Sequence, residues 1–95
     1  MKAELYQRYK EVLPDGSFIE WVIWRLPRLN PERPHRMKYR LAYIREGQRL
    51  VGYDNEQGKG DHKHIGNLQV PYRFVSIDQL LKDFLEDVRD ARGED

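Results

Sequence analysis

The sequence predicts an α+β fold, in which an antiparallel sheet of about four strands, connected as a meander, carries one C-terminal amphipathic helix on one face. Two observations lead to this prediction. Segments rich in aromatic and β-branched residues alternate with turn sequences up to about residue 53, and a helical apolar stripe follows after residue 76. A chain of 95 residues has room for a single core, so we expect one domain spanning residues 1–95.

The N-terminal segment 3–12 fits a helix or a strand by its pattern of apolar residues. The tripeptide Pro14-Asp15-Gly16 that follows is typical of a tight turn, because Pro presets φ and Gly tolerates positive φ. A turn at this point would join residues 3–12 to the next segment as a hairpin. We therefore predict a strand over residues 3–12.

Residues 17–26 form the clearest predicted strand, and both of its faces are apolar. One face carries Phe18, Val22 and Trp24, and the other carries Ile19, Trp21 and Ile23. Such a strand is central and covered on both sides. Because the single helix covers one sheet face only, we expect a homodimer, or another protein partner, to cover the second face around Trp21 or Trp24.

Two further strands are predicted after a proline-rich connection at residues 27–36. Residues 37–45 alternate between aromatic or aliphatic and basic side chains, and Glu46-Gly47 suits a hairpin turn into a fourth strand at residues 48–53. The stretch from Asp54 to Phe74 is predicted to be a long loop, with a short strand at residues 68–70 as its one regular element. Loops of this length in compact domains are usually functional or disordered.

The C-terminal helix has clear start and stop signals. Ser76 is a suitable N-cap, Gln79 occupies the matching capping-box position, and Gly93 is a natural end. Its apolar stripe follows spacings of three and four residues and comprises Ile77, Leu80, Leu81, Phe84, Leu85 and Val88. This spacing predicts a face packed on the sheet.

Composition narrows the class of protein. The chain has no Cys, which excludes disulfides and thiolate zinc sites, and its longest apolar run, residues 21–24, is far too short to span a membrane. We therefore expect a cytoplasmic protein. Residues 1–75 carry a net charge of +5 and residues 76–95 a net charge of −4. A basic body suits an anionic partner such as RNA or a nucleotide, although charges of this kind also simply solvate a surface.

The stretch 53–66, with sequence YDNEQGKGDHKHIG, concentrates the residues that carry chemistry. The chain has no Thr, and its two Ser residues lie at a turn and at a helix cap, which disfavours nucleophilic catalysis. His62 and His64 would project to one side of an extended segment and could share general acid and base roles in cleaving RNA without a metal. Lys59 or Lys63 would contact phosphate, and Asp61 or Asp54 would orient a histidine.

Other interpretations of this stretch remain open. His62, His64 and a carboxylate from Asp61 or Asp54 would also supply three metal ligands, as in a metal-dependent hydrolase or nucleotidyltransferase. Adjacent lysines disfavour a cation, so no metal or cofactor is predicted. A polar turn in a binding module without catalysis is a further interpretation.

A nucleic-acid-binding surface is predicted around the same stretch. Basic groups and aromatic rings together hold single strands through phosphate contacts and base stacking. The candidate residues are Arg33, His35, Arg36, Lys38, Arg40, Tyr53, Lys63 and Tyr72.

Four segments, in order, resemble the TumE-type toxin family of prokaryotic toxin–antitoxin systems: DGSFIEWVIWRLP, HRMKYRLAY, YDNEQGKGDHKH and PYRF, followed by an acidic amphipathic helix. The resemblance covers nearly the whole chain, with Lys63 where arginine is expected. It implies a toxin that is held inactive by a cognate antitoxin carrying a helix-turn-helix. The family resemblance supports this setting, whereas the reaction is inferred from the residues alone.

Overall fold

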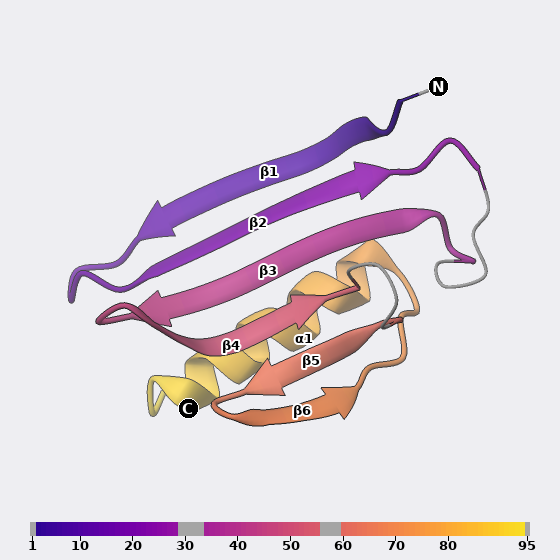
Figure 1. The fold of residues 1–95 in the computed structure, drawn as a ribbon. Helices are drawn as coiled ribbons and strands as arrows, with labels where there is room; N and C mark the ends of the chain where they lie inside the picture. Colours follow the sequence, from indigo (N-terminus) through magenta and orange to yellow (C-terminus); the bar gives the residue numbers. More distant parts are fainter. Residues whose placement is uncertain (1, 29–33, 56–59, 95) are drawn as a thin grey trace.

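A computed structural model describes residues 2–28, 34–55 and 60–94 of the chain. Within these residues, six strands form one antiparallel sheet in chain order, and one helix packs against it (Figure 1). The strands are β1 (Glu4–Val12), β2 (Phe18–Arg25), β3 (Met37–Arg45), β4 (Gln48–Asp54), β5 (His62–Ile65) and β6 (Leu68–Pro71), and the helix is α1 (Ile77–Ala91). The predicted α+β meander with a C-terminal helix is confirmed.

The sheet is larger than predicted, with six strands instead of about four. The prediction of a loop from Asp54 to Phe74 is wrong, because Asp54 ends β4 and the hairpin of β5 and β6 fills much of this range. Both added strands have four residues, and β5 is composed mainly of histidine and lysine. A short polar strand such as β5 lacks the apolar alternation by which a strand is recognised. Within the range, the short strand predicted at residues 68–70 is confirmed as β6.

The hairpin turns follow from local backbone preferences. Residues 4–12 of the predicted segment form an edge strand paired with β2, so the prediction of a strand over residues 3–12, rather than a helix, is confirmed. Gly16 takes a φ of 87° in the turn between these strands, and Glu46 and Gly47 take φ values of 52° and 75° between β3 and β4. Two consecutive residues with positive φ match the tight turns that follow the twist of a hairpin.

The core lies between the sheet and α1, which packs mainly against β4 and lies behind β4 and β5 in Figure 1. Phe84 meets Trp21 and Tyr53 edge to face, with ring centroids 6.3 and 5.9 Å apart. Buried apolar residues in this layer are Ile19, Trp21, Ile23, Met37, Tyr39, Leu41, Tyr43, Val51, Tyr53, Leu80, Phe84 and Val88. The helix therefore lies on the sheet face to which Trp21 and Tyr53 point.

The helix begins and ends close to the predicted positions. The Ser76 hydroxyl accepts a hydrogen bond from the Gln79 backbone N–H, as expected of an N-cap, and Gly93 has a positive φ just after the helix. In the predicted stripe, Leu80, Phe84 and Val88 are buried, whereas Leu85 is exposed. No described helix is long and apolar enough to cross a membrane.

The opposite side of the sheet, called here the helix-free face, carries the other alternating set of side chains. Strand register places directly opposed residues on the same face, and one such row runs Arg8, Val22, Arg40, Asp54 and His62 across five strands. The next row runs Lys10, Glu20, Ala42, Gly52 and His64. The helix-free face is thus basic over β1 to β3 and carries the histidines over β5.

The two tryptophans lie on different faces of β2. Trp21 is buried on the helix side, stacked on Tyr9 with ring centroids 4.5 Å apart, whereas Trp24 lies on the helix-free face and is half-buried. Phe18 and Val22 are also half-buried there. The expected homodimer or partner contact around Trp21 or Trp24 therefore stays a prediction, and its candidate surface is that of Trp24.

Candidate functional site on the helix-free face

Strand β5 separates its side chains between the two faces of the sheet. His62 and His64 project on the helix-free face, and their rings lie 5.0 Å apart. Lys63, between them, projects on the helix side and reaches Asp87 of α1. The two imidazoles thus share one side of an extended segment, which is the arrangement predicted from their spacing.

Asp54 is the carboxylate that joins the two histidines. Its side chain is opposite His62 in the register between β4 and β5, and its Oδ1 lies 2.7 Å from His62 Nε2. His62 Nδ1 lies 3.0 Å from the carbonyl oxygen of Gly60. His62 is therefore buried with both ring nitrogens directed at acceptor oxygens, a geometry that fixes the orientation of its ring.

His64 lies beside this pair and is more accessible. Its Nε2 is 3.7 Å from Asp54 Oδ2, and its side chain is 16% exposed, compared with 4% for His62. Of the two histidines, His64 is the one that a ligand on the helix-free face can reach. The two imidazoles therefore occupy different positions in the cluster, one fixed and buried and one at its surface.

Arg49 completes the cluster, because a bulge in β4 turns it to the helix-free face. The register shifts between Tyr43 and Ile44, so that Val51 opposes Tyr43 while Arg49 opposes Ile44. The Arg49 Nη1 lies 4.0 Å from Asp54 Oδ2. Its side chain runs over Gly52, where an added Cβ would come within 2.8 Å of Arg49 Cδ. Gly52 therefore makes the space through which Arg49 reaches Asp54.

This cluster also has the composition of a metal site. One ligand atom from each of Asp54, His62 and His64 lies within 4.8 Å of the others. Two imidazoles and one carboxylate suit a divalent transition metal with open coordination positions. The Asp54–His62 hydrogen bond would have to give way for both groups to bind an ion.

Cations lie next to the cluster on the same face. Arg40 of β3 is directly opposite Asp54, and Lys38, two residues earlier on β3, projects on the same face. Arg8 and Lys10 lie on β1. All four side chains are exposed. An anionic ligand that spans strands β1 to β5 would therefore meet positive charge before it reaches the histidines.

Asp61 occupies a second cluster, on the helix side, and contacts neither His62 nor His64 in any described interaction. It accepts hydrogen bonds from the Tyr39 hydroxyl at 2.7 Å and from Asn55 Nδ2 at 3.1 Å. His35 Nε2 lies 3.1 Å from both of its oxygens, while the Met37 backbone N–H donates to His35 Nδ1. The acceptor role of Nδ1 places the imidazole proton on Nε2, facing Asp61.

Aromatic packing holds this second cluster. The His35 ring lies against Phe74 with centroids 4.0 Å apart, and Tyr39 stacks on the same Phe74. Burial, and then the hydrogen bond to Asp61, raise the pKa of the Tyr39 hydroxyl well above its ordinary value. The hydroxyl therefore stays a proton donor to Asp61. The cluster connects β3, the residue before β5 and the segment before α1, and its role is structural.

Lys63, Tyr53 and Tyr72 face the helix. The Tyr53 hydroxyl donates to Asp87, which also pairs with Lys63 Nζ at 3.2 Å, and the Tyr72 hydroxyl donates to Asp83 at 2.6 Å. Burial raises the pKa of both tyrosines, with a further contribution from these carboxylates. Tyr53 is 1% exposed. In this structure its ring is part of the core.

Arg36 has a structural role in the connection between β2 and β3. Arg36 donates from Nε to the Leu26 carbonyl at 3.1 Å and from Nη2 to the Pro27 carbonyl at 3.3 Å, which closes the connection between β2 and β3. Lys59 and Arg33 lie outside the described residues. Among the predicted nucleic-acid-binding residues that the structure describes, Lys38 and Arg40 therefore share the helix-free face with His62 and His64.

Comparison with known proteins identifies the family. No curated protein and no solved structure matches the chain. The family model described as Toxin TumE matches residues 2–92, which is nearly the whole sequence. The chain therefore belongs to the TumE toxin family, a membership that indicates the toxin component of a toxin–antitoxin system and implies an antitoxin partner.

Proposed function

We propose that this toxin cleaves RNA at the Asp54–His62–His64 cluster without a metal ion. The observation that carries the proposal is the pairing of an accessible histidine with a buried Asp–His pair on a basic sheet face. An imidazole is suited to this work, because its ordinary pKa lies near neutral pH. The strands beside the cluster supply cations for the phosphate backbone.

In the proposed reaction, His64 accepts the proton of the ribose 2′-hydroxyl as the 2′-oxygen attacks the adjacent phosphorus. The bond from phosphorus to the 5′-oxygen breaks, and water supplies the proton that this leaving oxygen takes up. The products are a 2′,3′-cyclic phosphate and a free 5′-hydroxyl. Because both nitrogens of His62 already face acceptors, His62 and Asp54 position His64 rather than exchange protons with RNA.

Positive charge is needed where the reacting phosphate gains negative charge. Arg49 lies beside Asp54, so its guanidinium group takes this role in the proposal. Lys63 was expected to share it, but its ammonium pairs with Asp87 on the other face. For Lys59, a phosphate contact stays a prediction.

The test is a comparison of purified proteins on an oligoribonucleotide with a label at each end. His64→Ala should reduce cleavage by about 10²–10⁴-fold, the usual contribution of a positioned acid–base group. Growth arrest on expression should disappear with it. Ile65→Ala, on the same strand but half-exposed away from the cluster, is the matched control and should retain activity.

Four further outcomes of this assay would distinguish the alternatives. A substrate with 2′-deoxyribose at the cut position should remain intact, and a chelator should leave cleavage unchanged. Full activity of His64→Ala would remove the acid–base mechanism. RNA binding without any cleavage would instead indicate a non-catalytic binding module.

A metal-dependent hydrolase is the second candidate. The geometry of the same cluster favours it, because the ligand atoms of Asp54, His62 and His64 lie within 4.8 Å of one another. In that case, cleavage would stop with a chelator and return with Zn²⁺ or Mn²⁺. His62→Ala would then abolish metal binding in native mass spectrometry.

A further inference from the structure

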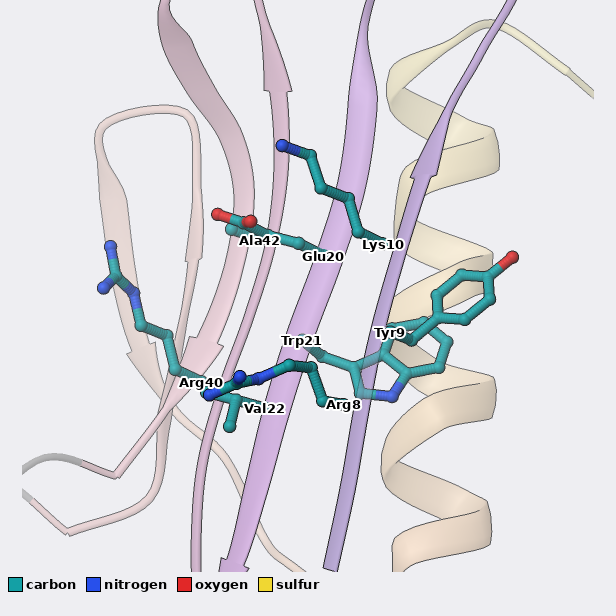
Figure 2. A pocket seen from close by; sticks show the side chains of 8 residues that line it. All are labelled: Arg8, Tyr9, Lys10, Glu20, Trp21, Val22, Arg40 and Ala42. Atoms are coloured by element: carbon teal, nitrogen blue, oxygen red, sulfur yellow. The ribbon is translucent and has the colours of Figure 1, made fainter. Parts of the chain in front are cut away.

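The helix-free face carries a hollow of about 290 Å³ over β1 to β3, away from the histidines. Its floor consists of the short side chains of Val22 and Ala42, and longer charged side chains from Arg8, Lys10, Glu20 and Arg40 stand around it. Figure 2 shows that these side chains extend on the side of the sheet opposite α1, whereas Tyr9 and Trp21 point toward the helix. The hollow therefore opens on the same face as the candidate site.

Strand register fixes the arrangement of charges around the hollow. Val22 lies between Arg8 and Arg40 in one cross-strand row, and Glu20 lies between Lys10 and Ala42 in the next. Arg8 and Arg40 therefore share the apolar neighbour Val22 on β2, and Glu20 lies beside Ala42, the smallest side chain of the floor.

Three of these charged groups have no ionic or hydrogen-bonding partner among the described residues. Among the described residues, Arg8, Arg40 and Glu20 form no ion pair or side-chain hydrogen bond. Lys10 does not neutralise Glu20, because its ammonium lies 4.7 Å above the ring of Phe18. Two unpaired guanidinium groups and an unpaired carboxylate around one apolar floor are available to a ligand.

The mixture of charges limits the ligand. A bare phosphate would be attracted by Arg8 and Arg40 but repelled by Glu20, so the ligand must combine an anion with hydrogen-bond donors. An RNA nucleotide has both, and its flat base suits an apolar floor with arginines beside it. Among the bases, guanine presents two adjacent donors, N1–H and the N2 amino group, that a single carboxylate can accept together.

We infer that this hollow is a guanosine-binding subsite, in which Arg8 and Arg40 hold phosphate and Glu20 reads the guanine edge. The inference rests on the proposed function in taking RNA as the ligand. Val22 and His62 lie in one row three strands apart, which corresponds to about 14 Å at the usual strand spacing. A single strand crossing the sheet would thus place a guanosine a few nucleotides from the position that is cut.

Binding is measured on the His64→Ala background with 2′-O-methyl hexamers, which lack the attacking hydroxyl, and with a chelator present, so that cleavage does not interfere even if this variant is active. Fluorescence anisotropy compares two labelled hexaribonucleotides that differ by one central G or U. The G form should bind at least about fivefold more tightly, as expected for a bidentate base contact. Glu20→Gln should reduce this ratio to near one, because the amide offers one acceptor oxygen, whatever its effect on overall affinity.

Arg8→Gln should weaken both hexamers and reduce the slope of log affinity against log salt by about 0.7, as expected for one lost phosphate contact to a single strand. Arg73→Gln, which removes an exposed arginine after β6, is the matched control for charge and should leave the G-to-U ratio unchanged. Equal affinity of the parent for both hexamers, or an unchanged ratio in Glu20→Gln, would overturn the subsite.

The two proposals fail in different ways. If His64→Ala proves fully active but the guanosine preference depends on Glu20, the subsite stands and the reaction mechanism falls. If cleavage depends on His64 while both hexamers bind alike, the mechanism stands and the subsite falls. Thermal unfolding of each variant shows whether it is folded at the assay temperature.

Discussion

Two histidine–aspartate pairs lie on opposite sides of the same sheet, and their surroundings differ. His35 and Asp61, on the helix side, form a closed cluster in which Asp61 accepts from three side chains and the His35 ring lies against Phe74. His62 and Asp54, on the helix-free face, adjoin a more accessible His64 and a row of cations.

The difference shows that residue type alone does not indicate a role. In the helix-side cluster, the groups that donate hydrogen bonds to Asp61 are buried or half-buried side chains of the protein itself. Asp61 therefore stabilises the contacts between strands and connections. In the other cluster the neighbouring arginines and His64 are directed toward the open face, where a ligand can meet them. The neighbours of each pair, rather than the pair itself, distinguish a structural cluster from a candidate functional site.

The largest expected effect is a loss of stability in Asp61→Ala. The substitution removes the acceptor shared by Tyr39, Asn55 and His35, and Tyr39 and Asn55 are almost fully buried. Unsatisfied buried donors cost about 1–3 kcal/mol each, and partial rearrangement should leave a loss of about 3 kcal/mol in the free energy of unfolding. Urea denaturation measures it.

Asp90→Ala, at an exposed position near the end of α1, is the control for removing a carboxylate, and its change should stay within about 0.5 kcal/mol. If Asp61→Ala were no less stable than this control, the helix-side cluster would not have a structural role. The contrast between the two pairs would then need another basis.

Elements with strong local signals could be predicted from the sequence. Residues 17–26 carry a dense run of aromatic and β-branched residues, and Ser76 with Gln79 marks the start of the helix, so both were located closely. Strand β5 could not be predicted, because its pairing with β4 and β6 gives stability to a segment whose own composition is polar.

The site could be predicted in part. The spacing of His62 and His64 was sufficient to place them on one face, but the choice between Asp54 and Asp61 depends on which strand lies next to β5. Arg49 was missed. Strict alternation along residues 48–53 would put it on the helix side with Val51, and only the bulge in β4 reverses this. A glycine inside a strand, Gly52, was the available signal of that irregularity.

A second, intermediate effect tests how Arg49 is positioned on the helix-free face. In Gly52→Ala the new methyl group would meet Arg49 Cδ at 2.8 Å and Nε at 3.0 Å, so the arginine must move away from Asp54. Because a flexible side chain gives way, stability should change little. Cleavage should fall by roughly 10–100-fold, as expected when a charge-stabilising group is displaced.

The double variant Gly52→Ala with Arg49→Ala separates this effect from others. If Gly52 acts through Arg49, the double variant should be no less active than Arg49→Ala alone, since the displaced side chain is already absent. Additive losses in the cleavage rate would show that the glycine matters for another reason, such as access of RNA to His64.

The smallest expected effect compares one cation from each face through the salt dependence of RNA binding. Arg40→Gln, on the helix-free face, should lower the slope of log affinity against log salt by about 0.7. Lys63→Gln should leave that slope unchanged, because Lys63 pairs with Asp87 on the helix side, and should cost no more than about 1 kcal/mol of stability as a partly exposed ion pair. Equal reductions of the slope in both variants would mean that RNA reaches the helix side of β5, and the two faces would then not differ in the way that their charges indicate.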